Sequence, residues 1–232
     1  MSHFVVAGCG RSGTMFTWQL LNWLDVRTSF EEFFGSQARC VTADDYKTWL
    51  QSTSTAGEVS GLSPPYSSIM AEAGVTVVHL VRNPVAVIAS LLGLNTFTKP
   101  MVWSRNVKFN FRHVPEMNLT DDPLDLALKY WLHWNAMVEP HAAAWFRAED
   151  LTTVGAVSRL VCACTGSSAV DTAQAKTALG HFGKTWNAKD RKGIRWASIP
   201  DSQLKTQVAM AAERYGYGMD ELREHCPHCG VL

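Results

Sequence analysis

Apolar runs and amphipathic stretches alternate along this chain. Residues 4–8 form an apolar run, and a glycine-containing loop separates it from a stretch whose apolar residues recur at helical spacing. A second apolar run covers residues 75–81 and is again followed by a helical pattern, over residues 84–92. Strands that are apolar over their whole length are typical of parallel sheets covered on both faces. The pattern therefore predicts repeated strand–helix units and an α/β fold.

The rest of the pattern predicts further elements of both kinds. We expect a strand at about residues 26–30, a helix over 124–139, a strand over 144–147 and two later helices, the last over Ser202–Tyr215. Ser198 and Asp201 are predicted to form a capping box for that last helix. Residues 94–122 are irregular and too long for an ordinary loop, so we expect an acceptor-binding or lid segment, or a packed excursion with short helices.

The loop after the first apolar run combines glycines with one arginine. A strand, a tight glycine turn and a helix N-terminus form a phosphate cradle, because free N–H groups and the positive end of the helix dipole face one point. Residues 8–13 fit the Gly-x-Gly-x-x-Gly fingerprint of dinucleotide binding, which would indicate an oxidoreductase. A nucleoside-triphosphate loop is disfavoured, since Thr14 and Met15 stand where it needs Lys and Ser/Thr. In a third interpretation, Arg11 itself faces a 5′-phosphate that becomes a leaving group.

The second apolar run ends in another combination of a cation and a hydroxyl. Arg82 follows the run, and Asn83 and Pro84 suit the cap and the first turn of the next helix. Ser90 lies two helical turns further on, so its hydroxyl points back along the face that Arg82 flanks. Because arginine suits bidentate contacts to phosphate, this pair is predicted to hold a second phosphate.

Together these two segments resemble the sulfotransferase family that uses 3′-phosphoadenosine-5′-phosphosulfate (PAPS). In that family an (Arg/Lys)-Ser-Gly-Thr loop binds the 5′-phosphosulfate, and an Arg-x-Pro segment with a later serine binds the 3′-phosphate. Both patterns occur here, at residues 10–14 and 82–90. Residues 145–151 are similar to a strand end of the family, and residues 127–139 to the helix before it. The resemblance spans about residues 4–216 and implies PAPS as the donor, with no metal required.

The resemblance also implies a catalytic base. Sulfuryl transfer is an in-line displacement, so the enzyme must deprotonate the acceptor and neutralise charge on the leaving oxygen. Residues 25–32 look like a stretch of tyrosylprotein sulfotransferases whose second glutamate, 21 residues past the loop arginine, is the base. Glu32 stands 21 residues past Arg11 and is expected to be the base, with Glu31 as runner-up. Arg11 is expected to bridge the 5′-phosphate and the sulfuryl group.

The remaining donor contacts follow from the same resemblance. The expected PAPS-binding residues are Gly10, Arg11, Ser12, Gly13, Thr14, Met15, Phe16, Arg82, Ser90, Arg191, Lys192 and Gly193. Phe16 stands where cytosolic members place an adenine-stacking tryptophan, and core packing is the alternative for it. Residues 190–193 match the family's late Arg-Lys-Gly segment only in part, because Trp196 replaces a glycine; a solvated basic loop is the alternative.

Charge balance, apolar stretches and cysteine content limit which binding partners and which location are expected. Lys+Arg and Asp+Glu both number 21, so no global field favours a polyanion such as nucleic acid. No stretch approaches about 18 apolar residues, and the N-terminal run lacks the basic flank of a signal peptide, so we expect a cytoplasmic protein without a membrane partner. Six cysteines in that compartment do not predict disulfides. His225–Cys229 would supply only half of a zinc site, so residues 217–232 are expected to be a tail.

These observations lead to one preferred interpretation. We predict a single domain over residues 1–232 with a P-loop-like three-layer α/β fold, in which helices flank a central, mainly parallel sheet. The expected activity is PAPS-dependent sulfuryl transfer to a hydroxyl or amine of a small molecule, peptide or carbohydrate. The alternatives are an NAD(P)-dependent oxidoreductase and a nucleotide-binding module without catalysis.

Overall fold

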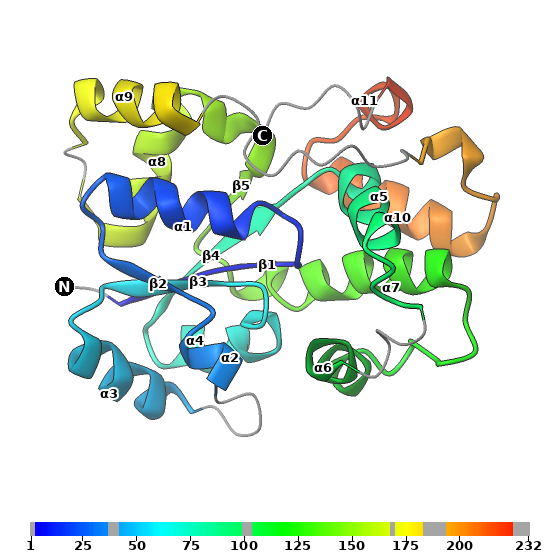
Figure 1. The fold of residues 1–232 in the computed structure, drawn as a ribbon, viewed down its shortest axis with the longest axis horizontal. Coiled ribbons are helices and arrows are strands. Elements are labelled where there is room, and N and C mark those ends of the chain that lie inside the picture. Colours follow the sequence, from blue (N-terminus) through cyan, green and yellow to red (C-terminus); the bar gives the residue numbers. More distant parts are fainter. Residues whose placement is uncertain (1–2, 37–41, 99–103, 168–169, 183–193, 225–232) are drawn as a thin grey trace.

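The centre of the molecule is a parallel β-sheet. The structure is a computed structural model that describes residues 3–36, 42–98, 104–167, 170–182 and 194–224. The strands are β1 (Phe4–Gly8), β2 (Thr28–Phe30), β3 (Gly57–Ser60), β4 (Thr76–Val81) and β5 (Ala144–Arg147). They lie in the order β2-β3-β1-β4-β5, and every neighbouring pair is parallel (Figure 1). The prediction of a central, mainly parallel sheet is confirmed.

Helices cover both faces of this sheet (Figure 1). One face packs against α1 (Thr14–Trp23), α8 (Val154–Thr165) and α9 (Thr172–Phe182). The core on the other face draws on α3 (Ala43–Thr53), α4 (Ser67–Glu72), α5 (Pro84–Gly93), α7 (Pro123–Ala136) and α10 (Gln203–Arg214). Side chains alternate between the faces of a strand, so Phe4 and Val6 of β1 enter the first core while Val5 and Ala7 enter the second. The result is the expected three-layer fold.

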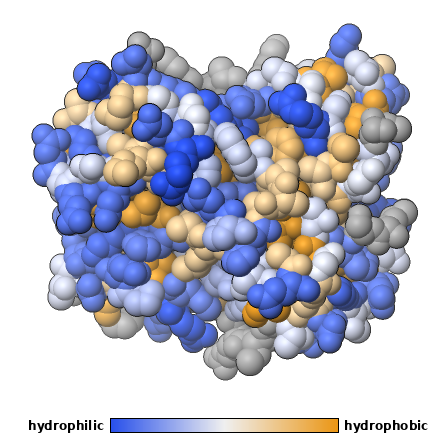
Figure 2. Space-filling model, turned by 180° about the vertical axis from the view of Figure 1, so that it is seen from behind, coloured by the Kyte–Doolittle hydropathy of each residue, from blue (hydrophilic) through white to orange (hydrophobic). Residues whose placement is uncertain are grey.

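Short elements connect these layers. They are α2 (Phe33–Ser36), α6 (Arg105–His113), α11 (Met219–Glu224) and the 3₁₀ turns η1 (Pro64–Tyr66), η3 (Glu139–His141), η4 (Ala148–Thr152) and η5 (Trp196–Ser198). The helix α6 lies inside the segment 94–122 that was expected to be irregular. No helix in the described ranges is long and apolar enough to cross a membrane. Figure 2, from the opposite side, shows hydrophilic residues along much of the outline and apolar ones gathered nearer the middle.

The prediction for the cap of the last long helix is wrong. Helix α10 is capped by Ser202, whose hydroxyl accepts a hydrogen bond from the Lys205 backbone N–H at 3.1 Å. The Asp201 carboxylate instead pairs with the Lys205 ammonium at 2.9 Å, and the Ser198 hydroxyl donates to the Arg195 carbonyl at 2.7 Å. The cap therefore stands four residues later than the Ser198 cap that the pattern indicated.

The strand order marks the edge of the sheet at which a ligand site is expected. In open α/β sheets, ligands occupy the crevice at the carboxyl ends of strands where the connections reverse direction. Here the chain leaves β1 toward β2 and β3 on one side and later returns to β4 and β5 on the other. The loop after β1, Gly61 after β3 and Arg82 after β4 therefore meet at this switch point.

Candidate functional site

The loop between β1 and α1 has a backbone that needs glycine at two positions. Gly13 adopts φ 85°, in the left-handed region that side chains disfavour, and it is the N-cap of α1. A Cβ atom on Gly8 would lie 2.4 Å from the Leu80 carbonyl oxygen on β4, so this position needs glycine for space. Arg11 has φ 75° without being glycine. Such strain persists only where the surroundings enforce it, and it concentrates at functional sites.

This loop presents the N-terminus of α1 to the sheet edge. The first N–H groups of a helix lack intrahelical acceptors and carry the positive end of its dipole. The Ser12 side chain takes no part in this surface, because it is buried with its Oγ 2.7 Å from Cys9 Sγ. The Ser12 N–H donates to the Cys9 carbonyl at 3.1 Å, so Gly13 and Thr14 stand at the helix end itself. Burial raises the pKa of the Cys9 thiol to about 12, which keeps it neutral.

The two segments predicted to bind phosphates form one continuous cluster. The Arg11 guanidinium donates through Nε to the Ser90 hydroxyl at 2.9 Å, and Arg82 donates through Nη1 to the Arg11 carbonyl at 3.1 Å. Ser90 lies on α5 and is only 5% exposed. Two guanidinium groups and a helix N-terminus thus converge at the switch point. Such a combination is suited to a ligand with more than one negative charge.

Side chains from later in the chain hold the Arg82 segment in place. The Asn83 backbone N–H donates to the Glu149 carboxylate at 3.0 Å, and Arg82 Nε lies 4.0 Å from the same carboxylate oxygen. The other Glu149 oxygen accepts from the Tyr217 hydroxyl at 2.7 Å. Tyr217 is 1% exposed, although it begins the segment expected to be a tail. Trp131 of α7 donates to the Arg82 carbonyl at 3.0 Å, so the strand end is fixed from several sides.

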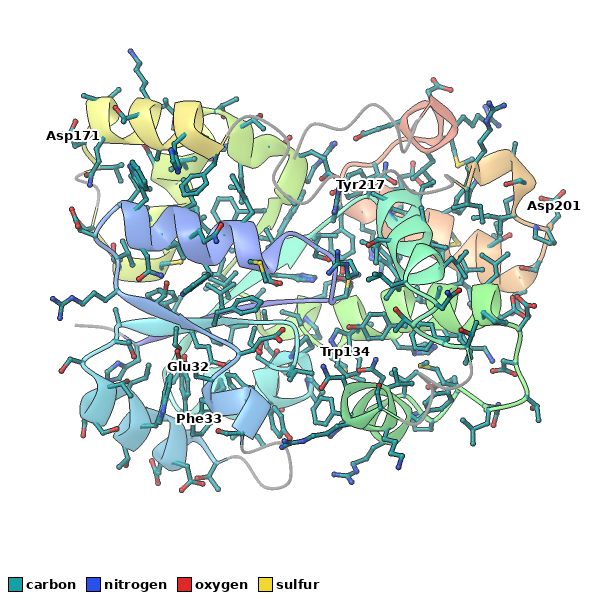
Figure 3. All side chains as sticks on the ribbon, viewed as in Figure 1. Glu32, Phe33, Trp134, Asp171, Asp201 and Tyr217 are labelled. Carbon is teal, nitrogen blue, oxygen red and sulfur yellow. The ribbon has the colours of Figure 1, made fainter. Side chains whose placement is uncertain are left out.

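Glu31 faces the loop, and Glu32 does not share its environment. Glu31 has φ 50°, and its Oε1 accepts from the Gly61 backbone N–H at 3.1 Å. A Cβ atom on Gly61 would lie 3.1 Å from that oxygen and 3.4 Å from Gly10 Cα, so Gly61 stands between the carboxylate and the loop. Burial raises the pKa of Glu31, and the Gly61 hydrogen bond partly offsets this. Glu32 is exposed, and Figure 3 shows it with Phe33 beside α2 and α3.

Two aromatic residues of α7 support both sides of this site. The Tyr130 hydroxyl accepts from the Gly10 N–H at 2.8 Å, and the Trp134 indole donates to the Gly61 carbonyl at 2.8 Å. Both rings are buried, at 4% and 0% exposure, and their centroids are 5.0 Å apart. Figure 3 labels Trp134 on α7, near the ends of the strands. A helix was expected over residues 124–139, but no local signal indicated the contacts of these residues with Gly10 and Gly61.

The remaining predicted residues have varied surroundings. Phe16 is 6% exposed and meets Phe182 edge to face at 6.1 Å, so its ring is part of the core on the α1 face. Met15 is 40% exposed in the first turn of α1. Arg191, Lys192 and Gly193 lie outside the described residues, as do Cys226, His228 and Cys229. Within the described ranges, no cluster of three or more His, Cys, Asp or Glu side chains is arranged to hold a metal.

Comparison with known proteins shows the class of fold. No protein family model matches the chain, and no curated protein matches it. Among solved structures it is similar to the sulfotransferase domain of the Synechococcus PCC 7002 olefin synthase, with a TM-score of 0.54 and 17% sequence identity. The similarity covers 94% of this chain and 96% of that domain. The chain therefore has the fold of a sulfotransferase domain over almost its entire length.

Proposed function

We propose that this protein is a PAPS-dependent sulfotransferase. The observation that carries the proposal is the cluster in which Arg11 contacts Ser90 and Arg82 contacts the Arg11 carbonyl. PAPS carries a phosphosulfate at one end of its ribose and a phosphate at the other, so it needs cations at two points of one crevice. The fold shared with a sulfotransferase domain adds support, because open α/β sheets bind ligands at the sheet edge where this cluster lies.

The residues of this cluster are proposed to bind different ends of PAPS. Arg11, in the loop at the N-terminus of α1, is proposed to meet the 5′-phosphosulfate and the charge that grows on its bridging oxygen. Arg82 and Ser90 are proposed to hold the 3′-phosphate. The direct contact between Arg11 and Ser90 joins the two halves, so binding at one phosphate also positions the guanidinium used at the other.

Glu31 is our preferred general base, and Glu32 is the alternative. A base is most effective when its pKa lies near the working pH, and burial raises the pKa of Glu31. Its carboxylate is also next to Gly61 and Gly10, whereas Glu32 is exposed. In the proposed step, Glu31 takes the acceptor's proton while the acceptor oxygen or nitrogen forms a bond to sulfur. The bond from sulfur to the bridging oxygen breaks, and 3′,5′-ADP leaves with its new charge facing Arg11.

The two alternatives explain less of the site. An NAD(P)-dependent oxidoreductase accounts for the glycine loop, but it gives no reason for the Arg11, Ser90 and Arg82 cluster. A binding module without catalysis accounts for the cluster, but not for a half-buried glutamate held in a left-handed conformation beside the loop. We propose an acceptor that carries a hydroxyl or an amine, and a cytoplasmic location.

The direct test is turnover of the donor. Purified protein is incubated with PAPS carrying a labelled sulfuryl group and with pools of alcohols, phenols, sugars and peptides, and 3′,5′-ADP release and labelled product are measured. Sulfuryl transfer is expected in the wild type and in Arg27→Ala, since Arg27 is exposed and away from the cluster. Arg11→Ala is expected to abolish it. Equal turnover in Arg11→Ala and wild type would exclude the proposed site.

A further inference from the structure

Glu58 is a carboxylate in the interior of the sheet. It lies on β3, it is 0% exposed, and its strand neighbours are Val5 on β1 and Ser29 on β2. An apolar residue would be far cheaper to bury at such a position, because an ionised carboxylate loses its hydration there. No ion pair to Glu58 exists among the residues that the structure describes. Its presence therefore needs a reason other than core stability.

The hydrogen bonds of Glu58 provide that reason. Its Oε2 accepts from the Ser29 hydroxyl at 3.1 Å and from the Phe33 backbone N–H at 2.9 Å, and its Oε1 accepts from the Phe34 N–H at 3.3 Å. Ser29 lies two residues before Glu31, and Phe33 and Phe34 directly follow Glu32. One carboxylate thus ties together both ends of the turn that presents the glutamates.

That turn needs an external constraint to keep its shape. Glu31 has φ 50°, a conformation that is strained for a non-glycine residue and persists only when neighbours over-determine it. The Gly61 N–H holds the Glu31 side chain, but it does not fix the backbone on either side. On the strand side the Glu31 backbone N–H donates to the Val59 carbonyl at 3.3 Å, and on the helix side Glu58 supplies the backbone constraint through Phe33 and Phe34.

We propose that Glu58 is a positioning residue for sulfuryl transfer, which clamps the Glu31–Glu32 turn so that the base faces the acceptor. This inference rests on the proposed function. Glu58 reaches the reaction only through the turn, so its removal is expected to lower kcat without weakening the contacts of Arg11, Arg82 and Ser90 with the nucleotide. A misplacement of about 1 Å is enough to cost about 100-fold in rate.

The protonation state of Glu58 affects the hydrogen bonds that hold the turn. Burial raises its pKa to about 7, and the nearby charge of Glu32 adds to this, while the Phe33, Phe34 and Ser29 donors oppose it. The other group that faces it is Tyr46 of α3, whose hydroxyl donates to the Phe4 carbonyl at 2.7 Å. Among the described residues, the three partners of the Glu58 carboxylate are all donors, so its ionised form matches them best.

The test is Glu58→Gln, with Glu213→Gln as a matched control on the exposed face of α10. The amide keeps the size of the side chain but turns one acceptor into a donor that faces a backbone N–H. Hydrogen exchange of peptides covering residues 29–36 is compared with exchange over residues 4–14. kcat with PAPS and the Kd of 3′,5′-ADP are measured on the same preparations.

We expect exchange over 29–36 to accelerate about tenfold or more and kcat to fall by about 10–100-fold, with the Kd of 3′,5′-ADP within about twofold of wild type. Unchanged exchange over 29–36, or kcat within about twofold, would overturn the proposal. Loss of protection throughout the sheet together with loss of 3′,5′-ADP binding would also overturn it, since Glu58 would then be a general core residue.

If Glu58→Gln does not fold, the same measurements are made on the milder variant Ser29→Ala. Ser29→Ala removes one donor and leaves both backbone donors, and we expect a smaller increase in exchange over 29–36 with a several-fold lower kcat. Wild-type values for both would contradict the clamp. If the wild-type protein transfers no sulfuryl group while Glu58→Gln still loosens residues 29–36, the proposed function fails and the structural part of the inference stands.

Discussion

The choice between the two glutamates gives a sharp prediction. Replacing Glu31 by Gln removes the base but keeps an oxygen that accepts the Gly61 N–H, so the turn is expected to stay folded. A positioned general base contributes about 10²–10⁴ in rate, which corresponds to about 3–5 kcal/mol of transition-state stabilisation. We therefore expect kcat in Glu31→Gln to fall by about 10²–10⁴ with an unchanged Kd for 3′,5′-ADP. Glu32→Gln, exposed and one residue away, is the matched control and should lose less than about tenfold.

The pH profile adds a second measurement to the same pair. Burial raises the pKa of Glu31. In wild type and in Glu32→Gln, the fall of kcat/KM on the acidic side should therefore have an apparent pKa above that of an ordinary glutamate. The residual activity of Glu31→Gln should lack that fall. The assay is initial-rate release of 3′,5′-ADP between about pH 5 and 9, spanning the raised pKa. A large loss in Glu32→Gln together with near-normal rates in Glu31→Gln would refute the reasoning from burial and restore the assignment made from sequence spacing.

Three further variants test separate parts of the account. Arg82→Gln should weaken the binding of 3′,5′-ADP by about 10–100-fold in calorimetry, because a charge-assisted hydrogen bond is lost, and should leave the binding of 5′-AMP nearly unchanged. Equal losses of affinity for both nucleotides would argue against a 3′-phosphate contact. Gly13→Ala should destabilise the protein by about 1–2 kcal/mol in urea unfolding because φ is 85°, whereas Gly180→Ala, in a helix with open space, should not. Burial lowers the pKa of His79 to about 4, so its contribution to stability is present above pH 6.5 and is lost as the pH falls toward 4. Between about pH 7.5 and 5, the free energy of unfolding should therefore fall less in His79→Gln than in wild type. An equal fall in both proteins would contradict the conclusion that His79 stays neutral in the folded state.

The sequence was sufficient to predict the parts of the fold that local pattern controls. Residues 4–8 form an apolar run and residues 75–81 form one broken only by Thr76 and His79, and the structure has β1 and β4 there. Asn83 was predicted as a helix cap, and its Oδ1 accepts from the Val85 N–H at 2.9 Å. The strand β3 was missed because Glu58 and Ser60 interrupt its apolar pattern, although both are buried. Their burial depends on partners distant in sequence, which a local pattern does not contain.

The sequence could predict the site only where the spacing of residues along the chain determines which side chains lie close together. The glycine loop follows directly from the strand end before it. Ser90 was expected to share a phosphate with Arg82, and the structure places its hydroxyl against Arg11. The contact between Arg11 and Ser90 joins residues 79 positions apart, so it needed the sheet order. The difference between Glu31 and Glu32 depends on a backbone angle and on Gly61, and the sequence gives no sign of either. Tyr130, Trp134 and Tyr217 likewise act through long-range hydrogen bonds.

Calorimetry with the wild-type protein tests the central claim most directly. Binding of 3′,5′-ADP, 5′-AMP and NAD is measured in one buffer at fixed salt. The cluster of Arg11, Arg82 and Ser90 predicts tightest binding for 3′,5′-ADP, with 5′-AMP about tenfold or more weaker because one phosphate is missing. Binding of NAD without binding of 3′,5′-ADP would contradict the account.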